Sequence, residues 1–461
     1  MSHDAERGAR GLIRKIEHVV RHTLDSKRVI LFNPYTFQVL VVTPEVDLLL
    51  QRLFGPRARH EITGQLAEQV PRLISAGFLV PLDYDEGAHV RSMSTEAACP
   101  TDVSTLFVVP TMGCNLACRY CFVYQRGRDF PDKNLTWETF LMGVDAYLRS
   151  FDHAREGLNR VVFYGGEPLL RTGFVERVMV HLEEARRGGA FGPRELAFGL
   201  STNGTLVTEE SARMLGRHQV MTSVSLDGDP GANVLRVSAG PHQQTFEAAV
   251  EGLELLERHG VHTIISVVIG RHNLETLGAG LQWFQENLQT RRLSINFVNR
   301  RPGGDLRDEG ASLSRQDVEL VYRTIYARGF VENSVEAYRE VLGDRVLGAP
   351  HCGAVGGHMI LRPDGKVSLC TLLLDSDRTA VALERGTNLS EEPTWQEWGS
   401  RRALDPRMSR CHRRCSYFST CTGGCPYESL ARHGDIWTVN EEECDRQKAA
   451  INVALELLAT A

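Results

Sequence analysis

The chain has 461 residues, of which 42% are apolar and 24% are charged, and its formal net charge is −6. These values are ordinary for globular domains, and the length exceeds what one hydrophobic core usually spans, so we expect two or three domains. The acidic balance excludes the basic surface field that drives binding to a nucleic-acid backbone.

The first twenty residues mix both charge signs and lack the unbroken apolar core of a secretory signal. No apolar run in the sequence approaches the roughly 20 residues that cross a bilayer. We therefore expect a cytoplasmic protein with no membrane partner and no nucleic-acid partner.

Residues 1–90 are predicted to form a small winged-helix-like module. Two β-rich runs around a Pro-containing turn, VILFN and FQVLVV, predict a hairpin. A helix is expected to begin with Thr43 as its N-cap and Pro44 as its first residue. The apolar residues expected on its buried face are Val46, Leu49, Leu50 and Leu53.

The module is expected to continue with two short helices that are separated at Pro71. Gly77 is predicted to cap the second of these helices, and the strand FLV follows it. The next stretch is polar, and residues 91–103 are predicted to be a linker.

From residue 104 to about 310 the pattern changes to regular alternation of strands and helices. The strand candidates are STLFVVP, NRVVFY, LAFGLST, VMTSVSL, HTIISVV and RLSINFV. Six such alternations predict right-handed βαβ units around a parallel sheet. Periodicity does not decide between a partial barrel and an open, doubly wound sheet. Residues 311–345 are predicted to be mostly helical, and residues 346–461 form a cysteine-rich region that ends in a helix.

Four unusual motifs lie at the ends of the first four predicted strands: the first three follow their strands, and the last ends the fourth. They are CNLACRYC at 114–121, GGEP at 165–168, TNG at 202–204 and SLDG at 225–228. In parallel α/β folds the ligand site lies at the carboxyl ends of the strands. The four motifs are therefore expected to meet at one edge of the sheet.

Eleven cysteines are present, and ten of them fall into two groups, with Cys99 alone in the linker. The first group is Cys114, Cys118 and Cys121; the second is Cys352, Cys370, Cys411, Cys415, Cys421, Cys425 and Cys444. Close spacing in a long chain favours metal ligation over disulfides. Structural zinc would need a fourth ligand near the triplet, whereas three thiolates suit a [4Fe–4S] cluster with one open iron. Spacing alone leaves zinc and buried structural cysteines open.

The ordered motifs resemble the radical S-adenosylmethionine (SAM) superfamily over roughly residues 104–298. The resemblance rests on the CxxxCxxC triplet after the first strand, with Tyr120 before its last cysteine, and on the GGEP, TNG and SLDG motifs in that order. It implies a partial (β/α)6 TIM-like barrel in which the triplet holds three irons. SAM would then occupy the fourth iron through its amino and carboxylate groups.

The resemblance also implies which residues bind SAM. These are Tyr120 and Phe122 beside the cluster and the adenine, Gly165, Gly166 and Glu167 at the methionine amino group, Asn203, Ser225 and Asp227 at the ribose and carboxylate, and Arg236 at the carboxylate. Taken singly, Asn203-Gly204 and Asp227-Gly228 are ordinary turn dipeptides, and an arginine is most often a solvated surface charge. Their order along the chain favours the functional interpretation.

The C-terminal cysteines resemble a SPASM domain, which carries two auxiliary [4Fe–4S] clusters. The family usually has two residues between its third and fourth cysteines, whereas three separate Cys411 from Cys415 here. A zinc ribbon is the structural alternative for CHRRC…CTGGC. The resemblance implies one cluster on Cys411, Cys415, Cys421 and Cys444 and a second on Cys352, Cys370 and Cys425. The second cluster then lacks a fourth cysteine, and a substrate thiolate, His351 or His358 would complete it.

The N-terminal module resembles the winged-helix recognition element that binds leader peptides of ribosomally made, post-translationally modified peptides. An exposed strand edge beside a helix can accept such a peptide as an added strand. A stabilising or dimerisation domain is the alternative.

Together these resemblances imply a radical SAM peptide maturase with three [4Fe–4S] clusters. SAM cleavage would release a 5′-deoxyadenosyl radical that abstracts hydrogen from a precursor peptide, and a thioether or carbon–carbon cross-link would form. A reductant such as flavodoxin or ferredoxin is expected as a second partner. The alternatives are oxidation of a Cys or Ser in a folded protein, as in anaerobic sulfatase maturation, a small-molecule enzyme with the same clusters, and an Fe–S electron carrier.

Overall fold

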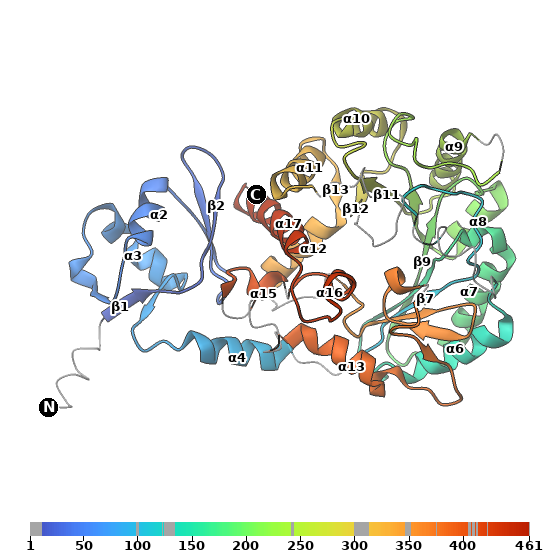
Figure 1. Cartoon of the computed structure of the whole chain (residues 1–461), viewed down its shortest axis with the longest axis horizontal. Coiled ribbons are helices and arrows are strands. Elements are labelled where there is room, and N and C mark those ends of the chain that lie inside the picture. Colours follow the sequence, from blue (N-terminus) through green and yellow to red (C-terminus); the bar gives the residue numbers. More distant parts are fainter. Residues whose placement is uncertain are drawn as a thin grey trace.

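The computed structural model describes residues 12–97, 101–121, 123, 134–240, 244–298, 313–345, 352–374, 376–403, 407, 411, 414–421 and 423–460. Its N-terminal module lies to one side of a curved α/β core, and the C-terminal helix lies between them (Figure 1). No helix in these ranges is long and apolar enough to span a membrane.

The N-terminal module contains two small antiparallel sheets. Their strands are β2 (Val20–Thr23), β3 (Val29–Phe32) and β4 (Val39–Val42) in one sheet, and β5 (Arg57–Ala58), β1 (Leu12–Lys15) and β6 (Leu79–Pro81) in the other. The predicted hairpin is confirmed, because β3 pairs with β4 and places Ile30 opposite Val41. The strands β1, β2 and β5 lie outside the sequence prediction.

Helix α2 (Pro44–Gln51) begins as predicted, with the Thr43 side chain accepting a hydrogen bond from the backbone N–H of Val46. Its buried face differs from the prediction, because Leu49 is 38% exposed whereas Asp47 is buried. Asp47 is tolerated there because its carboxylate accepts a hydrogen bond from the Arg21 guanidinium at 2.9 Å.

The prediction that Pro71 separates two helices is wrong. A single helix, α3 (Gly64–Ser75), runs through Pro71 and buries Leu66, Val70 and Leu73. Burial of these side chains outweighs the one backbone hydrogen bond that proline removes. Gly77 follows the helix with φ of 75°, the left-handed conformation expected at a C-cap.

The connector between the module and the core is helical over its first part. Helix α4 (Glu86–Ala97) occupies polar sequence in which we expected a linker, and it enters the core along the lower side of Figure 1. Its first residue, Glu86, forms an ion pair with Arg14 of β1 at 3.0 Å.

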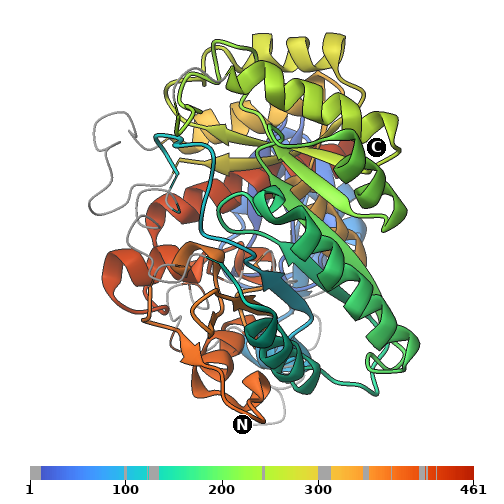
Figure 2. The ribbon, with the colours of Figure 1, turned by 90° about the vertical axis from the view of Figure 1, so that its right-hand side faces the viewer.

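The six predicted core strands are confirmed, and they are parallel and adjacent in chain order. They are β7 (Thr105–Val108), β8 (Leu158–Phe163), β9 (Glu195–Thr202), β10 (Met221–Ser225), β11 (Thr263–Ile269) and β12 (Arg292–Phe297). The helices between them are α6 (Trp137–Arg149), α7 (Thr172–Arg187), α8 (Glu209–Arg217), α9 (Thr245–Arg258) and α10 (Leu277–Asn287). These helices cover the outer face of the curved sheet, as the green helices in Figure 2 show. The other face of the sheet is the inner face, as in a partial barrel.

Segments beyond the predicted barrel extend this sheet to ten strands. The short strand β13 (Val331–Glu332) pairs with β12, and β14 (His358–Leu361) pairs in parallel with β7 at the other edge. The strands β15 (Lys366–Ser368) and β16 (Val381–Ala382) then continue the sheet. Pairing with β14 covers the exposed backbone edge of β7, so the cysteine-rich region is part of the core sheet.

The remaining helices lie around the open side of the barrel. They are α11 (Arg315–Ala327), α12 (Asn333–Asp344), α13 (Pro393–Gly399), α15 (Phe418–Cys421), α16 (Pro426–His433) and α17 (Glu441–Thr460). Short 3-10 helices occur at Arg59–Glu61 in the N-terminal module, at Pro168–Arg171 between β8 and α7, and at Thr371–Leu373, Leu389–Glu391 and Ser400–Ala403. The predicted helical stretch before the cysteine-rich region and the predicted C-terminal helix are both confirmed.

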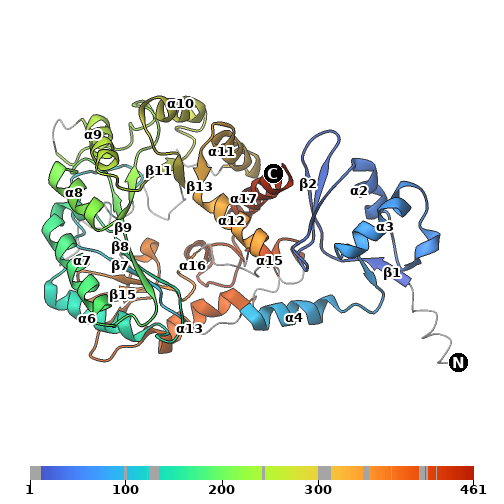
Figure 3. The ribbon, with the colours of Figure 1, turned by 180° about the vertical axis from the view of Figure 1, so that it is seen from behind.

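Aromatic and polar contacts join the N-terminal module to the C-terminal region. Phe418 is 1% exposed and belongs to the hydrophobic core of the module, where its ring lies 5.4 Å from that of Tyr35. His22 of β2 also contacts Glu456 of α17, which forms an ion pair with Arg323 of α11 at 2.6 Å. Figures 1 and 3 both show α17 between the module and the core. The module is therefore packed directly on the cysteine-bearing segment.

Candidate functional site

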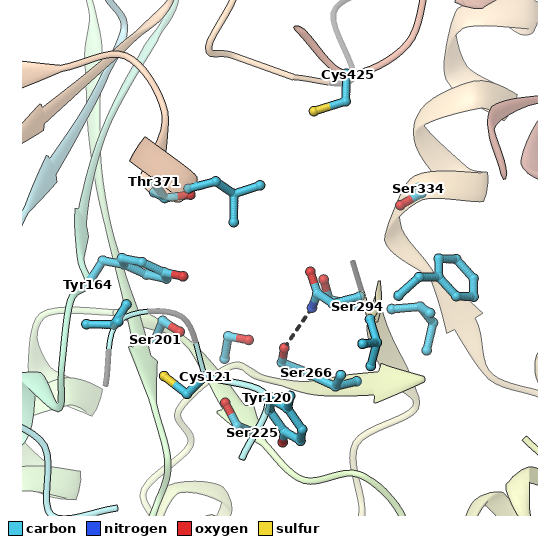
Figure 4. Close-up of a pocket in the computed structure, with 18 of the residues that line it drawn as sticks. Tyr120, Cys121, Tyr164, Ser201, Ser225, Ser266, Ser294, Ser334, Thr371 and Cys425 are labelled. Carbon is cyan, nitrogen blue, oxygen red and sulfur yellow. Dashed lines mark hydrogen bonds between the residues drawn. The ribbon is translucent and has the colours of Figure 1, made fainter. Parts of the chain in front are cut away.

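One cavity of about 940 Å³ lies inside the barrel and brings the two cysteine groups together. The triplet loop forms one end of it, and Cys352, Cys421 and Cys425 line the other. In Figure 4, Cys121 and Cys425 lie on opposite sides of this space. Cavities that bind small molecules are typically about 300–1,000 Å³, so this one has room for a cofactor together with part of a substrate.

The triplet directly follows β7, as predicted, and its thiols are largely enclosed. Burial raises the pKa of Cys114 to about 12 and that of Cys118 to about 11. The backbone N–H of Leu116 donates to Cys114 Sγ at 3.4 Å, and the Asn203 side-chain amide lies 3.8 Å from the same sulfur. Such thiols are protonated and unreactive by themselves, whereas a bound metal displaces their protons.

The GGEP turn supports the triplet loop through backbone contacts. The N–H of Gly166 donates to the carbonyl of Thr111 at 3.0 Å, and the N–H of Glu167 donates to the carbonyl of Gly113 at 2.8 Å. A Cβ atom on Gly166 would lie 2.0 Å from the Gly113 oxygen. Only glycine allows this approach, which fixes the backbone immediately before Cys114.

We expect Gly166→Ala to displace the triplet loop and to reduce SAM cleavage at least tenfold, because the added methyl group overlaps the Gly113 carbonyl. The measurement is the rate of 5′-deoxyadenosine formation by the reconstituted protein under a chemical reductant. The matched control is Gly173→Ala, at a helical position where a Cβ meets no atom within 4 Å. Equal rates for Gly166→Ala and the wild type would contradict this role of the turn.

Glu167 links the GGEP turn to the TNG turn. It is 1% exposed, and its carboxylate accepts hydrogen bonds from the backbone N–H of Asn203 at 2.8 Å and the hydroxyl of Thr202 at 2.8 Å. Burial raises the pKa of Glu167, and these hydrogen bonds oppose that shift. The Asn203 amide in turn donates to the side chain of Asn115, inside the triplet loop, at 2.9 Å. Three of the four motifs are thus joined by hydrogen bonds.

The fourth motif joins them through Asp227, Tyr120 and Arg236. The Tyr120 hydroxyl donates to Asp227 at 2.5 Å and accepts from Arg236 Nη1 at 2.6 Å. Burial would lower the pKa of Arg236, but the neighbouring Tyr120, Asp227 and Cys118 raise it above its ordinary value. Arg236 is therefore a permanent buried cation beside the triplet, with its guanidinium on the cavity wall.

A set of serines lines the barrel wall, of which the sequence analysis singled out only Ser225. The set is Ser201, Ser223, Ser225, Ser266 and Ser294, and the register of the strands places Ser201 beside Ser223 and Ser266 between Ser225 and Ser294. In Figure 4, Ser266 accepts a hydrogen bond from Asn296 at 3.1 Å. Buried parallel strands are usually continuous apolar runs, so serines at alternate positions were a signal that could have identified this wall.

The C-terminal cysteines influence one another electrostatically in two groups, and three of them line the cavity. Burial raises the pKa of Cys421 well above its ordinary value, and the charges of Cys444, Cys411 and Cys415 raise it further. Burial likewise raises the pKa of Cys425, and electrostatic repulsion from Glu443, Cys352 and Cys370 raises it further. The SPASM resemblance assigns these cysteines to two clusters in the same way, and their ligation stays a prediction.

The donor set suits clusters better than single metal ions. None of the ten cysteines that the structure describes forms a disulfide. Over the described residues, no three Cys, His, Asp or Glu side chains are close enough together to hold one metal ion, as structural zinc requires. A [4Fe–4S] cluster instead binds each thiolate to a different iron.

Some predicted residues remain without a structural account of their role. His358 lies beside Gly353, the neighbour of Cys352, and its ring packs against Phe107 at 4.9 Å, so its ligation to the second auxiliary cluster stays a prediction. Phe122, His351 and Cys99 fall outside the residues that the structure describes.

Comparison with known proteins matches residues 108–284 to the family described as the Radical SAM superfamily. A similar curated protein is the "Serine-type anaerobic sulfatase-maturating enzyme" of Klebsiella aerogenes, 24% identical over 72% of this chain and 82% of the relative. The solved structure "Native anSMEcpe with bound AdoMet" covers 77% of this chain and 98% of its own, at 19% identity and a TM-score of 0.61. Streptococcus suis SuiB bound to its precursor peptide SuiA covers 94% of this chain and 99% of its own, at 15% identity and a TM-score of 0.54.

Proposed function

We propose that this chain, a radical SAM enzyme, modifies a ribosomally made precursor peptide by forming a thioether or carbon–carbon cross-link. The observation that carries the proposal is the cavity in which the triplet and the C-terminal cysteines face each other. A substrate held between them would be within reach of both groups. An electron carrier has no need of such a space.

Three [4Fe–4S] clusters and SAM are the cofactors of this proposal. Cys114, Cys118 and Cys121 would hold the cluster that binds SAM. Cys411, Cys415, Cys421 and Cys444 would hold one auxiliary cluster, and Cys352, Cys370 and Cys425 the other. When bound, the first cluster and SAM supply a 5′-deoxyadenosyl radical that removes hydrogen from an unactivated carbon.

The protein would bind SAM through the residues around the triplet. Arg236 presents a fixed positive charge to the SAM carboxylate, and Tyr120 and Asp227 hold the guanidinium in place. The glycines at 165 and 166 let the GGEP turn pack against Val109, Thr111 and Gly113, and this packing would hold the turn in place to receive the methionine amino group of SAM. The serine wall offers hydroxyl groups to the polar groups of the substrate, and the enclosed cavity excludes water from the radical.

The N-terminal module is proposed to bind the leader of the precursor peptide. Strand β4 is one edge of its sheet, and in the segment that follows it in the chain Leu48 and Phe54 are 45% and 76% exposed. An extended peptide that adds to a strand edge gains main-chain hydrogen bonds, and apolar side chains beside the edge add affinity. The similarity to SuiB, which extends over 94% of this chain, supports this assignment.

In this proposal the chain divides as the sequence suggests. Residues 1–90 are the leader-binding module and 91–103 the connector, 104–310 the radical SAM core, 311–345 the bridging helices, and 346–461 the SPASM domain. A cytoplasmic flavodoxin or ferredoxin would supply the electron.

The test is anaerobic reaction of the reconstituted enzyme with a candidate precursor peptide, offered with and without its leader. We expect the peptide with its leader to lose the mass of two hydrogen atoms, since a cross-link replaces two bonds to hydrogen by one new bond. Tandem mass spectrometry should show no fragmentation between the linked residues. SAM cleavage with no change in the peptide would contradict the proposal.

A second candidate is oxidation of a Cys or Ser in a protein substrate. The similarity to the serine-type sulfatase-maturating enzyme over 72% of this chain favours it. Its product would carry a carbonyl group that reacts with a hydrazide, whereas a cross-linked peptide would not. A leader-independent, hydrazide-reactive product would select this candidate.

A further inference from the structure

Arg401 is a buried arginine with unusually few partners. It is 1% exposed and lies in the 3-10 helix Ser400–Ala403, before the CHRRC segment. Its Nη2 donates to the backbone carbonyl of Gly423 at 3.0 Å. Its Nε and Nη1 atoms are also buried, and neither has a hydrogen-bond partner among the residues that the structure describes. A buried cation with two unmatched donors is costly unless negative charge lies beside it.

The groups around Arg401 are thiols from both auxiliary sets. Burial lowers the pKa of Arg401, and thiolate charge on Cys425, Cys411, Cys421 and Cys352, as in metal-bound cysteines, would oppose this shift. Cys425 and Cys352 belong to one set, and Cys411 and Cys421 belong to the other. Gly423, which accepts from Nη2, stands between Cys421 and Cys425 in the sequence and so connects the two sets.

The carboxylate of Glu443 is an alternative partner for the positive charge of Arg401. Glu443 is buried and lies within the field of Arg401. Glu443 has partners of its own, because it accepts a hydrogen bond from Gln447 at 2.5 Å and lies 3.8 Å from Arg446. Among the residues that the structure describes, Glu443 is therefore not a hydrogen-bond partner of the two unmatched donors of Arg401.

We propose that Arg401 is a positioning residue between the two auxiliary clusters, where its charge and its two unmatched N–H groups stabilise the clusters in their reduced form. This inference rests on the proposed binding of auxiliary clusters. Each thiolate-bound cluster becomes one unit more negative when it takes up one electron, and a fixed cation nearby favours that state. Arg401 thus raises the reduction potential of both clusters and helps them accept an electron from the substrate radical.

The test compares Arg401→Met, Arg401→Lys and the wild type in the full-length, reconstituted protein. Dithionite supplies the electrons in a redox titration followed by electron paramagnetic resonance, without SAM or peptide. We expect Arg401→Met to make reduction of the auxiliary clusters roughly tenfold less favourable at a given potential, a shift of about 59 mV for one electron. Arg401→Lys, which keeps the charge, should stay close to the wild type.

The matched control is Arg378→Met. Arg378 also donates to a backbone carbonyl, that of Gly434 at 2.6 Å, but its side chain is exposed. This variant should keep the wild-type potentials.

Iron content separates the possible failures. A wild type that binds only about four irons per chain would refute the auxiliary clusters themselves and so the proposed function. Auxiliary clusters that bind normally and keep their potentials in Arg401→Met would overturn the role of Arg401 alone. If Arg401→Met loses iron, then iron content and potentials of Arg401→Lys that equal those of the wild type support the need for the charge. Loss of iron in both variants overturns the proposal in favour of a packing role.

Discussion

Replacing Cys114, Cys118 and Cys121 together by alanine is expected to lower the iron content from about twelve to about eight atoms per chain and to abolish 5′-deoxyadenosine formation. The three thiols lie at the same end of the cavity, with the GGEP, TNG and SLDG motifs around them. The triple variant would lack the donor set that we propose for the SAM-binding cluster, whereas the seven C-terminal cysteines remain. The loss of activity should therefore be complete and the loss of iron partial.

The measurement is iron and sulfide analysis after anaerobic reconstitution, with SAM cleavage followed under a chemical reductant. Cys99→Ala is the matched control, since it removes one cysteine for which no ligand role is predicted, and it should keep all the iron and activity. Zinc in place of iron, or equal cleavage by the triple variant and the wild type, would show that the triplet is not the site of radical formation.

The parts of this fold that depend on local pattern could be predicted from the sequence. The six core strands and the position of the four motifs after them follow from apolar runs and turn residues, which act over a few neighbouring residues. The hydrogen bonds that join Glu167 to Asn203 and Asn203 to Asn115 arise because these parallel strands end at one edge. The order of the motifs along the chain was enough to predict that they lie together at this edge of the sheet.

The features that depend on long-range contact could not be predicted. Strand β14 pairs with β7 across more than half of the chain, and Phe418 packs in the core of the N-terminal module. Neither contact has a local signature, because the energy comes from partners that periodicity does not identify. The uninterrupted helix through Pro71 has the same cause, since tertiary packing outweighed a local preference.

The role of Arg401 was hidden for a different reason. Its sequence context, SRRA, is that of an ordinary solvated arginine. Only its burial and its unmatched donors, together with the thiols around it, distinguish it from the exposed Arg378.

Arg236→Met is expected to weaken SAM binding about 10- to 100-fold, because a hydrogen bond to a charged group contributes about 1.5–3 kcal/mol. Arg236 is a buried cation that contacts the triplet loop through Tyr120. Asp227 keeps two other donors in the variant, the backbone N–H of Val268 at 2.9 Å and the hydroxyl of Tyr120 at 2.5 Å. The variant should therefore fold and retain its iron.

Anaerobic calorimetry with SAM measures the affinity, and iron content shows whether the site is intact. Arg236→Lys is the informative companion, since lysine keeps the charge but cannot make a bidentate contact with a carboxylate. We expect its affinity to lie between those of Arg236→Met and the wild type. If Arg236→Met binds SAM as tightly as the wild type while retaining its iron, then the Tyr120–Asp227–Arg236 network is a structural link between the triplet and the SLDG turn, and the SAM carboxylate must be bound by other groups on the cavity wall.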